Sequence, residues 1–218
     1  MTAPARKRVR LPAEVRARHL LEAALVEFAE HGFTATRIED IAHRAGLSKS
    51  GVYAHYASKE AIFEALLTHV MEPGPDQAQP LEEDFESVES LVDRFIDRIY
   101  TRMADPRVLG MLRLMVAESA RVPALIQRWH AEFVVSFHRA QARTMARGVE
   151  RGVIREGPLT EHFPLAYAPA LSAAITQIVT GHDSLGDPAL RDAHRRMMVD
   201  MLRPPGAVQN SSSSAAQR

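Results

Sequence analysis

The chain has 218 residues, 46% of them hydrophobic and 25% charged, so its core is large enough to be stable without disulfide bonds or structural metal ions. The absence of cysteine excludes disulfide bonds, thiolate metal sites and cysteine nucleophiles, and it fits a cytoplasmic protein. The formal net charge is zero, but residues 1–60 carry ten Lys and Arg against seven Asp and Glu, an excess that favours a polyanionic partner for this part of the chain but also lies within ordinary variation.

Both ends of the chain have compositions typical of unfolded segments. Residues 1–12 are basic and contain no apolar stretch, which excludes a secretory signal peptide and predicts a flexible arm. This arm either contacts a polyanionic partner or only keeps the chain in solution. Residues 204–218 contain four consecutive serines and predict a disordered tail. No stretch approaches the roughly 18 apolar residues of a membrane helix, so no membrane partner is expected.

Two helices are predicted in the first part of residues 13–70. The first covers about Pro12–Glu30, because its apolar residues recur at helical spacing and Gly32 follows as a C-terminal stop. The second begins at Thr36, whose hydroxyl forms a capping-box pattern with Glu39, and it ends near Ala45.

The next two predicted helices complete this domain. Gly46 tolerates the left-handed backbone of a tight turn, and Ser48 then caps a short helix that ends near His55. The helices on either side of this turn form a helix-turn-helix. Ser58 caps a fourth helix, whose predicted buried residues are Ile62, Phe63, Leu66, Leu67 and Val70.

A run rich in Pro and Gly at residues 71–80 is predicted to be a loop between two domains. After it, residues 81–203 are predicted to form a larger helical domain, and no segment shows a strand pattern. The fold class is therefore all-α. The five helices expected in this body lie at about 86–104, 106–120, 123–151, 160–180 and 188–202.

The stretch from His19 to Glu60 resembles the DNA-binding domain of tetracycline-repressor-type (TetR family) regulators. The motifs that carry the resemblance are Phe28–Phe33, Ala45–Ser48, Tyr53–Tyr56 and Ser58–Glu60. The resemblance implies a three-helix DNA-binding head followed by a helical body that binds a small molecule and forms a homodimer. Carried over by motif, the implied DNA-binding residues are Thr36, Ser48, Lys49, Ser50, Gly51, Tyr53, His55, Tyr56 and Lys59.

The resemblance also implies roles for these residues. Bases are read at the start of the second helix of the helix-turn-helix, where Lys49 lies, and phosphates are gripped by Tyr53, His55 and Lys59. Tyr56 stands where the family usually has Phe. Two alternatives stay open from the residues themselves: Tyr53 is a packing residue, or His55 only caps the end of its helix. Gly51 has no side chain to contact DNA, so its expected role is to let the backbone of the helix come close to the DNA.

The body offers a less specific set of candidate ligand-binding residues. Aromatic side chains recur at a spacing of four in residues 123–151, and methionines are dense before them. Such groups suit an apolar or aromatic small molecule, although an aromatic stripe on a helix is more often plain core. A polar pair among them either orients a ligand or faces the solvent or each other. The set comprises Met103, Met111, Arg113, Met115, Glu118, Trp129, Phe133 and Phe137, with Arg113 and Glu118 as the polar pair.

The last two predicted helices, at 160–180 and 188–202, carry more apolar surface than one-sided packing needs. Paired with their two-fold mates, they are expected to form a four-helix bundle in a homodimer.

No cofactor, metal site or enzymatic activity is expected. His130, His138 and His162 have no recognised ligand spacing, and no nucleophile-elbow, phosphate-loop or zinc-helix motif occurs. Two hypotheses therefore remain. The first is a ligand-responsive regulator of transcription that binds double-stranded DNA, in this family most often a repressor. The second is an architectural DNA-binding protein without a ligand, which predicts a body with no internal cavity.

Overall fold

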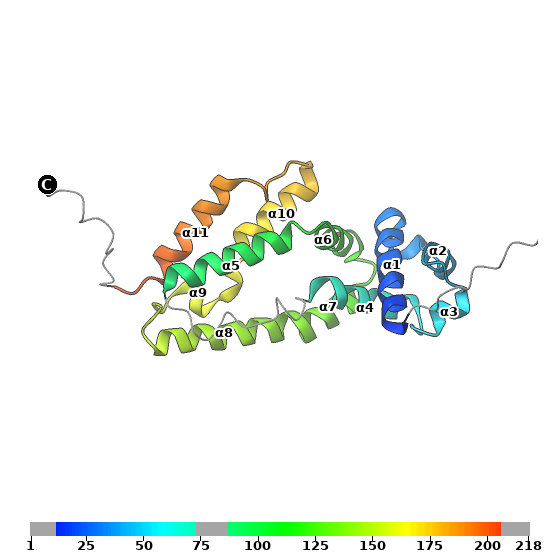
Figure 1. The fold of residues 1–218 in the computed structure, drawn as a ribbon, viewed down its shortest axis with the longest axis horizontal. Coiled ribbons are helices and arrows are strands. Elements are labelled where there is room, and N and C mark those ends of the chain that lie inside the picture. The colour runs from blue at the N-terminus through cyan, green and yellow to red at the C-terminus, as the bar shows by residue number, and fades with distance from the viewer. Residues whose placement is uncertain (1–11, 73–86, 206–218) are drawn as a thin grey trace, which may run out of the picture. The chain divides into compact units, whose positions relative to one another are not determined.

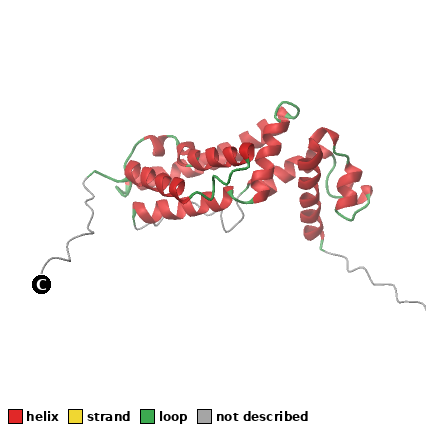
Figure 2. Cartoon of the chain, turned by 90° about the horizontal axis from the view of Figure 1, so that it is seen from above, coloured by secondary structure: helices red, strands yellow, loops and turns green. Residues whose placement is uncertain are grey.

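The computed structural model describes residues 12–72 and 87–205. Within these two ranges the chain forms helices joined by short turns, with no strand, so the predicted all-α fold is confirmed (Figures 1 and 2). Three predicted segments lie outside the described residues: the basic arm except Pro12, the Pro- and Gly-rich loop except Met71 and Glu72, and the tail from residue 206 onward. No helix in the described ranges has the length and apolar character needed to cross a bilayer.

The described helices group into two units. The first contains residues 12–72 and 110–129, and the second contains residues 87–109 and 130–205. Helix α6 (Pro106–Glu118) is therefore divided, and its residues from Gly110 onward belong to the first unit.

The core of the first unit is built by α1 (Ala13–Ala35), α2 (Ile38–Arg44), α3 (Lys49–Tyr53) and α4 (Lys59–Met71). Three phenylalanine rings meet at its centre, with centroids 5.2–5.7 Å apart. Such aromatic contacts add to the stabilisation that comes from burial of apolar area. The rings belong to Phe28, Phe33 and Phe63.

The junction between α1 and α2 differs from its prediction. Gly32 has a φ of 77° and interrupts α1 near its C-terminal end, as expected of a helix stop. However, α2 is capped by Arg37 and not by Thr36, and the side chain of Asp40 accepts a hydrogen bond from the Arg37 amide at 3.2 Å. Thr36 is buried, and its hydroxyl donates to the carbonyl oxygens of Gly32, at 2.8 Å, and Glu27, at 3.0 Å. The predicted capping box at Thr36 is wrong because this hydroxyl closes the end of α1 and does not open α2.

The other two predicted caps of this unit are confirmed. Ser48 Oγ accepts a hydrogen bond from the Gly51 amide at 3.1 Å at the start of α3. Ser58 Oγ accepts one from the Ala61 amide, also at 3.1 Å, at the start of α4. The five residues predicted to be buried on α4 are all buried.

Helices α6 and α7 (Pro123–Trp129) extend the first unit beyond the N-terminal four. Arg128 on α7 forms an ion pair of 2.8 Å with Glu64 on α4. Glu118, at the end of α6, is buried and pairs with Arg121 at 3.3 Å. Its carboxylate also lies against Gly32, where an added Cβ would come within 2.8 Å of Glu118 Oε1.

The second unit departs from the predicted helices at two places. The helix predicted at 123–151 contains a π-helical turn, His130–Val134, between α7 and α8 (Val135–Glu150). Apolar residues at a spacing of four do not distinguish this turn from an α-helix. The helix predicted at 160–180 is split into α9 (Pro158–Glu161), a 3₁₀ helix (Phe163–Ala166) and α10 (Ala168–Thr180).

Proline explains the second break. Pro164 and Pro169 lie inside the segment that was predicted to be one helix, and each stands in the first turn of a new one. Proline is tolerated there because the first amides of a helix have no partner within it, whereas in a helix interior it removes a hydrogen bond and clashes with the preceding turn.

Helices α5 (Val88–Met103) and α11 (Pro188–Leu202) lie side by side in the second unit, and three ion pairs join α5 to α11 and to Arg203, the residue that follows α11. Their bounds agree with the helices predicted at 86–104 and 188–202. Glu89, Asp93 and Asp97 recur every four residues along one face of α5. Their partners are Arg203, at 2.6 Å from Glu89, Arg195 and Arg191.

Candidate nucleic-acid interface

The helix-turn-helix consists of α2, the turn Ala45–Ser48 and α3. Gly46 has a φ of 67°, a left-handed conformation that suits glycine, and the Leu47 amide donates to the Ala42 carbonyl oxygen at 2.8 Å. Ile41, Ala42 and Val52 are buried between the two helices. This contact sets the angle between α2 and α3, and the small Ala42 side chain allows the two helices to approach closely.

One face of α3 is open to solvent. Lys49 and Ser50 are exposed at its start, and the Tyr53 side chain is 47% exposed at its end, whereas the preceding residue, Val52, is fully buried. Tyr53 is thus not a core residue, which removes the packing alternative. Donors and acceptors therefore stand along the exposed side of a short helix, as a base-reading helix requires.

Small residues shape the start of α3. Ser50 Oγ lies 3.0 Å from Ser48 Oγ, within hydrogen-bond distance. A Cβ at Gly51 would lie 3.3 Å from Ser48 Oγ, tighter than most real contacts, and 3.6 Å from the Leu47 Cβ, an ordinary contact. The lack of a side chain at Gly51 therefore preserves the cap of α3.

Lys49 is already paired with a carboxylate. Its Nζ lies 2.6 Å from Oε1 of Glu39 on α2. The hydrogen bond from Lys49 lowers the pKa of Glu39, and the same bond raises the pKa of Lys49, so both groups are charged at neutral pH. Glu39 was predicted only to be part of a helix cap, because the two residues of this pair are ten positions apart and no local pattern links them.

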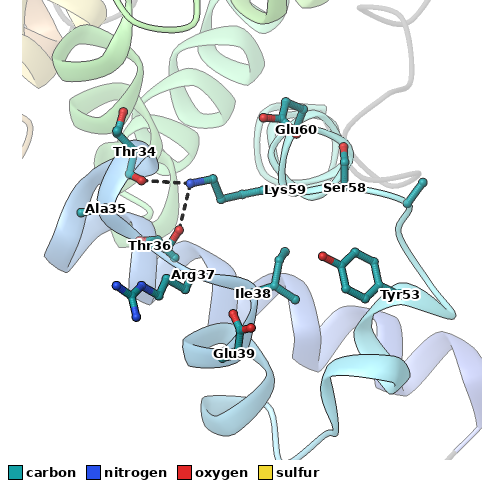
Figure 3. Close-up of a pocket in the computed structure, with 11 residues that line it drawn as sticks. Thr34, Ala35, Thr36, Arg37, Ile38, Glu39, Tyr53, Ser58, Lys59 and Glu60 are labelled. Carbon is teal, nitrogen blue, oxygen red and sulfur yellow. Dashed lines mark hydrogen bonds between the residues drawn. The ribbon is translucent and has the colours of Figure 1, made fainter.

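Lys59, at the start of α4, is held by the end of α1. Its Nζ donates to the carbonyl oxygens of Thr34, at 3.1 Å, and Thr36, at 2.9 Å (Figure 3). The ammonium also lies 4.7 Å from the ring centroid of Phe33, within the range of a cation–π contact. Lys59 thus ties α4 to the chain between α1 and α2.

An open groove of about 710 Å³ runs beside these residues. It lies between the end of α1, the start of α2, the end of α3 and the start of α4, and Tyr53 stands on its α3 side (Figure 3). Its lining residues are Thr34, Ala35, Thr36, Arg37, Ile38, Glu39, Tyr53, Ala57, Ser58, Lys59 and Glu60.

The remaining predicted DNA-binding residues differ in exposure. His55 and Tyr56 are half-buried, and burial raises the pKa of the Tyr56 hydroxyl. Helix α3 ends at Tyr53, so His55 lies beyond its last turn, although its amide still donates to the Val52 carbonyl oxygen at 2.9 Å. The Thr36 side chain is buried and does not present its hydroxyl to a phosphate.

A cluster of charges joins α1 to α2 behind this surface. Glu27 is buried and accepts a hydrogen bond from Arg44 Nε at 2.6 Å, and it pairs with His31 at 3.2 Å. Arg44 also reaches Glu30 at 2.7 Å. This network fixes α2 on α1 through groups that the sequence analysis did not single out.

The candidate ligand-binding residues are divided between the two units. In the first unit, Met111 is fully buried, Met115 and Trp129 are half-buried and Arg113 is exposed. Arg113 faces solvent, which was one of the alternatives for the polar pair. Glu118 binds Arg121 and not Arg113, so a pair between Arg113 and Glu118 is excluded.

In the second unit, Phe133 and Phe137 stack at 6.4 Å, and Met103 is half-buried. The structure adds three rings from other segments, those of Phe95, Phe163 and Tyr167, which spacing along one helix does not reveal. Together with His138, which follows Phe137 on α8, they form an aromatic cluster around Phe137. Within it, the Tyr167 hydroxyl and His138 Nε2 are 2.6 Å apart. Among the described residues, no cluster of three or more His, Asp or Glu is arranged to hold a metal ion.

Residues 20–66 match the family model for bacterial regulatory proteins of the tetR family. The chain is 31% identical over 193 residues to the HTH-type transcriptional repressor SCO4008 of Streptomyces coelicolor, which covers 85% of this chain and 93% of that protein.

Two solved structures share the fold of the chain. A TetR family regulator from Pseudomonas syringae pv. tomato has a TM-score of 0.68 at 20% identity, covering 87% of this chain and 96% of its own. FadR of Bacillus subtilis, in complex with stearoyl-CoA, has a TM-score of 0.64 at 19% identity, covering 84% and 97%.

The relationship to SCO4008 extends well beyond the helix-turn-helix and into the body, so the resemblance first seen in residues 19–60 holds for nearly the whole chain. The chain belongs to the TetR family of bacterial transcriptional regulators and is a DNA-binding regulator, not an enzyme.

Proposed function

We propose that this regulator is a ligand-responsive repressor that binds a palindromic operator as a homodimer and leaves it when a small molecule binds the body. Residues 13–70 bind DNA, and residues 81–203 bind the ligand and form the dimer. The protein acts in the cytoplasm, where bacterial DNA lies. The observation that carries this proposal is the exposed face of α3, with Lys49, Ser50 and Tyr53 beside an open groove.

In the proposed complex, α3 lies in the major groove. Lys49 and Ser50 meet base edges, because they stand at the start of the helix. Tyr53, which lines the groove, meets a phosphate, and so do His55 and Tyr56, which follow it in the sequence. Lys59 acts first as a clamp on the Thr34 and Thr36 carbonyl oxygens, and its third N–H remains for a phosphate. The backbone at Thr36 lines the same groove.

Exposed apolar side chains on the last two helices support the proposed dimer. On α10, Val179 is 77% exposed and Ile175 is 38% exposed, and Met197 on α11 is 38% exposed. Covering these side chains with a two-fold mate would bury apolar area and would give two recognition helices about 34 Å apart, one turn of DNA.

An apolar or aromatic effector is supported by the residues of the body and by one relative of the same fold. The aromatic cluster around Phe137 supplies apolar contacts, and FadR of Bacillus subtilis was solved with stearoyl-CoA. A ligand that binds one arrangement of the heads more tightly shifts the population of the dimer, with a typical coupling of about 1–3 kcal/mol.

Selection of bound sequences from a random pool of duplex DNA by the purified protein tests this function. Recovery of one palindrome is the expected result, and it supplies the probe for a ligand screen by release of DNA. Recovery of no preferred sequence, with binding only at low salt, would favour the alternative of an architectural DNA-binding protein.

A further inference from the structure

The pair formed by Glu39 and Lys49 joins the two helices of the helix-turn-helix. Glu39 is the second residue of α2 and Lys49 is the first residue of α3. Their side chains are 54% and 55% exposed, and Nζ lies 2.6 Å from Oε1. Glu39 also lines the groove that ends at α4 (Figure 3). A carboxylate thus stands on the proposed DNA-binding surface, next to the lysine of the recognition helix.

The pairing limits the contact that Lys49 makes with a polyanion. Phosphate contacts supply most of the affinity of non-specific binding, and they depend on cations that are free to neutralise phosphates. Lys49 reaches a phosphate only by leaving Glu39 or by bringing the phosphate charge beside the carboxylate. Base edges are different, because the O6 and N7 atoms of guanine accept hydrogen bonds without carrying a full charge.

We propose that Glu39 is a specificity-determining residue, which holds Lys49 away from phosphates and leaves it free to donate to a base. Lysine has three N–H donors, and the pair uses one, so Lys49 can donate to a base while it remains bound to Glu39. Glu39 therefore weakens binding to DNA of any sequence more than binding to the operator. This role rests on the proposed docking of α3 on DNA.

The test is the variant Glu39→Gln, which keeps the shape of the side chain and removes its charge. Binding to a fluorescent duplex of mixed sequence is measured by anisotropy over a range of salt concentrations. The Kd for this duplex is expected to fall about 1.5- to fivefold, the range of one exposed ion pair. The slope of log Kd against log salt concentration is expected to rise by about 0.9, because one more phosphate is neutralised.

Two further variants separate this role from a change in net charge. In a Lys49→Ala background, Glu39→Gln is expected to have no effect, since Glu39 acts through Lys49. Glu60→Gln removes an equal charge from the same groove and is expected to leave the salt slope unchanged. An equal gain from Glu60→Gln, or a gain that persists without Lys49, overturns the proposal.

The remaining outcomes are also decisive. Thermal unfolding of each variant checks that the helix-turn-helix stays folded, and Glu39→Ala provides a second variant at this exposed position. Unchanged binding to mixed-sequence DNA in both folded variants overturns the proposal. The measurement uses mixed-sequence DNA and needs no operator. Failure to select a palindrome would therefore count against the proposed repressor function, while the result for Glu39 could still be interpreted.

Discussion

The recognition helix α3 has five residues, so few side chains can carry its proposed contact with DNA. Lys49 and Tyr53 are exposed at its two ends, while Val52 between them is buried and Ser48 caps the helix. Exposure and motif together make these two residues the strongest candidates, whereas the Thr36 side chain is excluded by its burial.

Lys49→Ala and Tyr53→Ala are expected to weaken operator binding while the dimer stays intact. Loss of the base contact of Lys49 should cost about 1–3 kcal/mol and relax the sequence preference. Loss of a phosphate contact at Tyr53 should weaken binding to all sequences alike. Anisotropy with the selected operator measures both effects, and sedimentation measures the dimer.

Glu22→Ala is a control for these variants, because Glu22 is exposed on α1 and does not line the groove. It should bind the operator as the unchanged protein does. If both α3 variants retained full affinity, the docking of α3 on DNA would be wrong.

A buried histidine makes stability depend on pH. His194 is 2% exposed, and its Nε2 donates to the Ala166 carbonyl oxygen at 2.9 Å. Burial lowers the pKa of His194, despite this hydrogen bond. Burial, assisted by the nearby His130, also lowers the pKa of His138.

The free energy of unfolding is therefore expected to fall as the pH falls below about 6.5, the pKa of an unperturbed histidine. Below this pH the unfolded chain binds protons that the folded chain does not, so acid favours unfolding, and above it the contribution is constant. Urea unfolding at pH 8 and pH 5.5 measures the change. His194→Gln should reduce the difference between the two pH values, and an unreduced difference would exclude His194 as a source.

At the scale of elements, short-range signals located most helices well. Gly46, Ser48 and Ser58 marked the turn and the caps that the structure contains. Two helices were predicted to be longer than they are, and each has a local interruption. Two prolines divide residues 160–180, and a π-helical turn interrupts residues 123–151. The periodicity of apolar residues does not detect either interruption.

The pairing of α5 with α11 depends on charges as well as on apolar burial. Asp93→Asn is expected to lower the free energy of unfolding by about 0.2–1 kcal/mol, because Asp93 and Arg195 are partly exposed and water screens their attraction. The difference should shrink as salt is added. Urea unfolding at low and high salt measures it.

Asp192→Asn is the matched control, since Asp192 pairs with Arg196 inside α11 and joins no second helix. Its effect should be smaller than that of Asp93→Asn. Equal effects would mean that the pairs between α5 and α11 contribute no more than an ordinary pair on one helix.

At the scale of the whole molecule, the proposed dimer joins two heads to one palindrome. Val179→Asp on α10 is expected to dissociate the dimer, because it places a charge in apolar surface that the dimer would bury. Operator affinity should then fall, since one head makes only half of the contacts. Sedimentation measures the assembly, and anisotropy measures the binding.

Val116→Asp provides the comparison, because Val116 is 66% exposed on α6 and lies outside the proposed interface. It should remain dimeric. A Val179→Asp protein that also stayed dimeric would exclude this face of α10 as the interface.

Local patterns in the sequence were enough to predict the all-α class, the helix-turn-helix and the family, because caps, turn glycines and motif spacing act over a few residues. Which polar groups bind one another became known from the packed helices alone. The Lys59 ammonium meets the Thr34 carbonyl oxygen across 25 residues of sequence, and Arg44 on α2 meets the carboxylate of Glu27 on α1 across 17 residues. Lys49 likewise meets Glu39 from another helix. Such partners come within hydrogen-bond distance only after the helices have packed, so no local pattern predicts them.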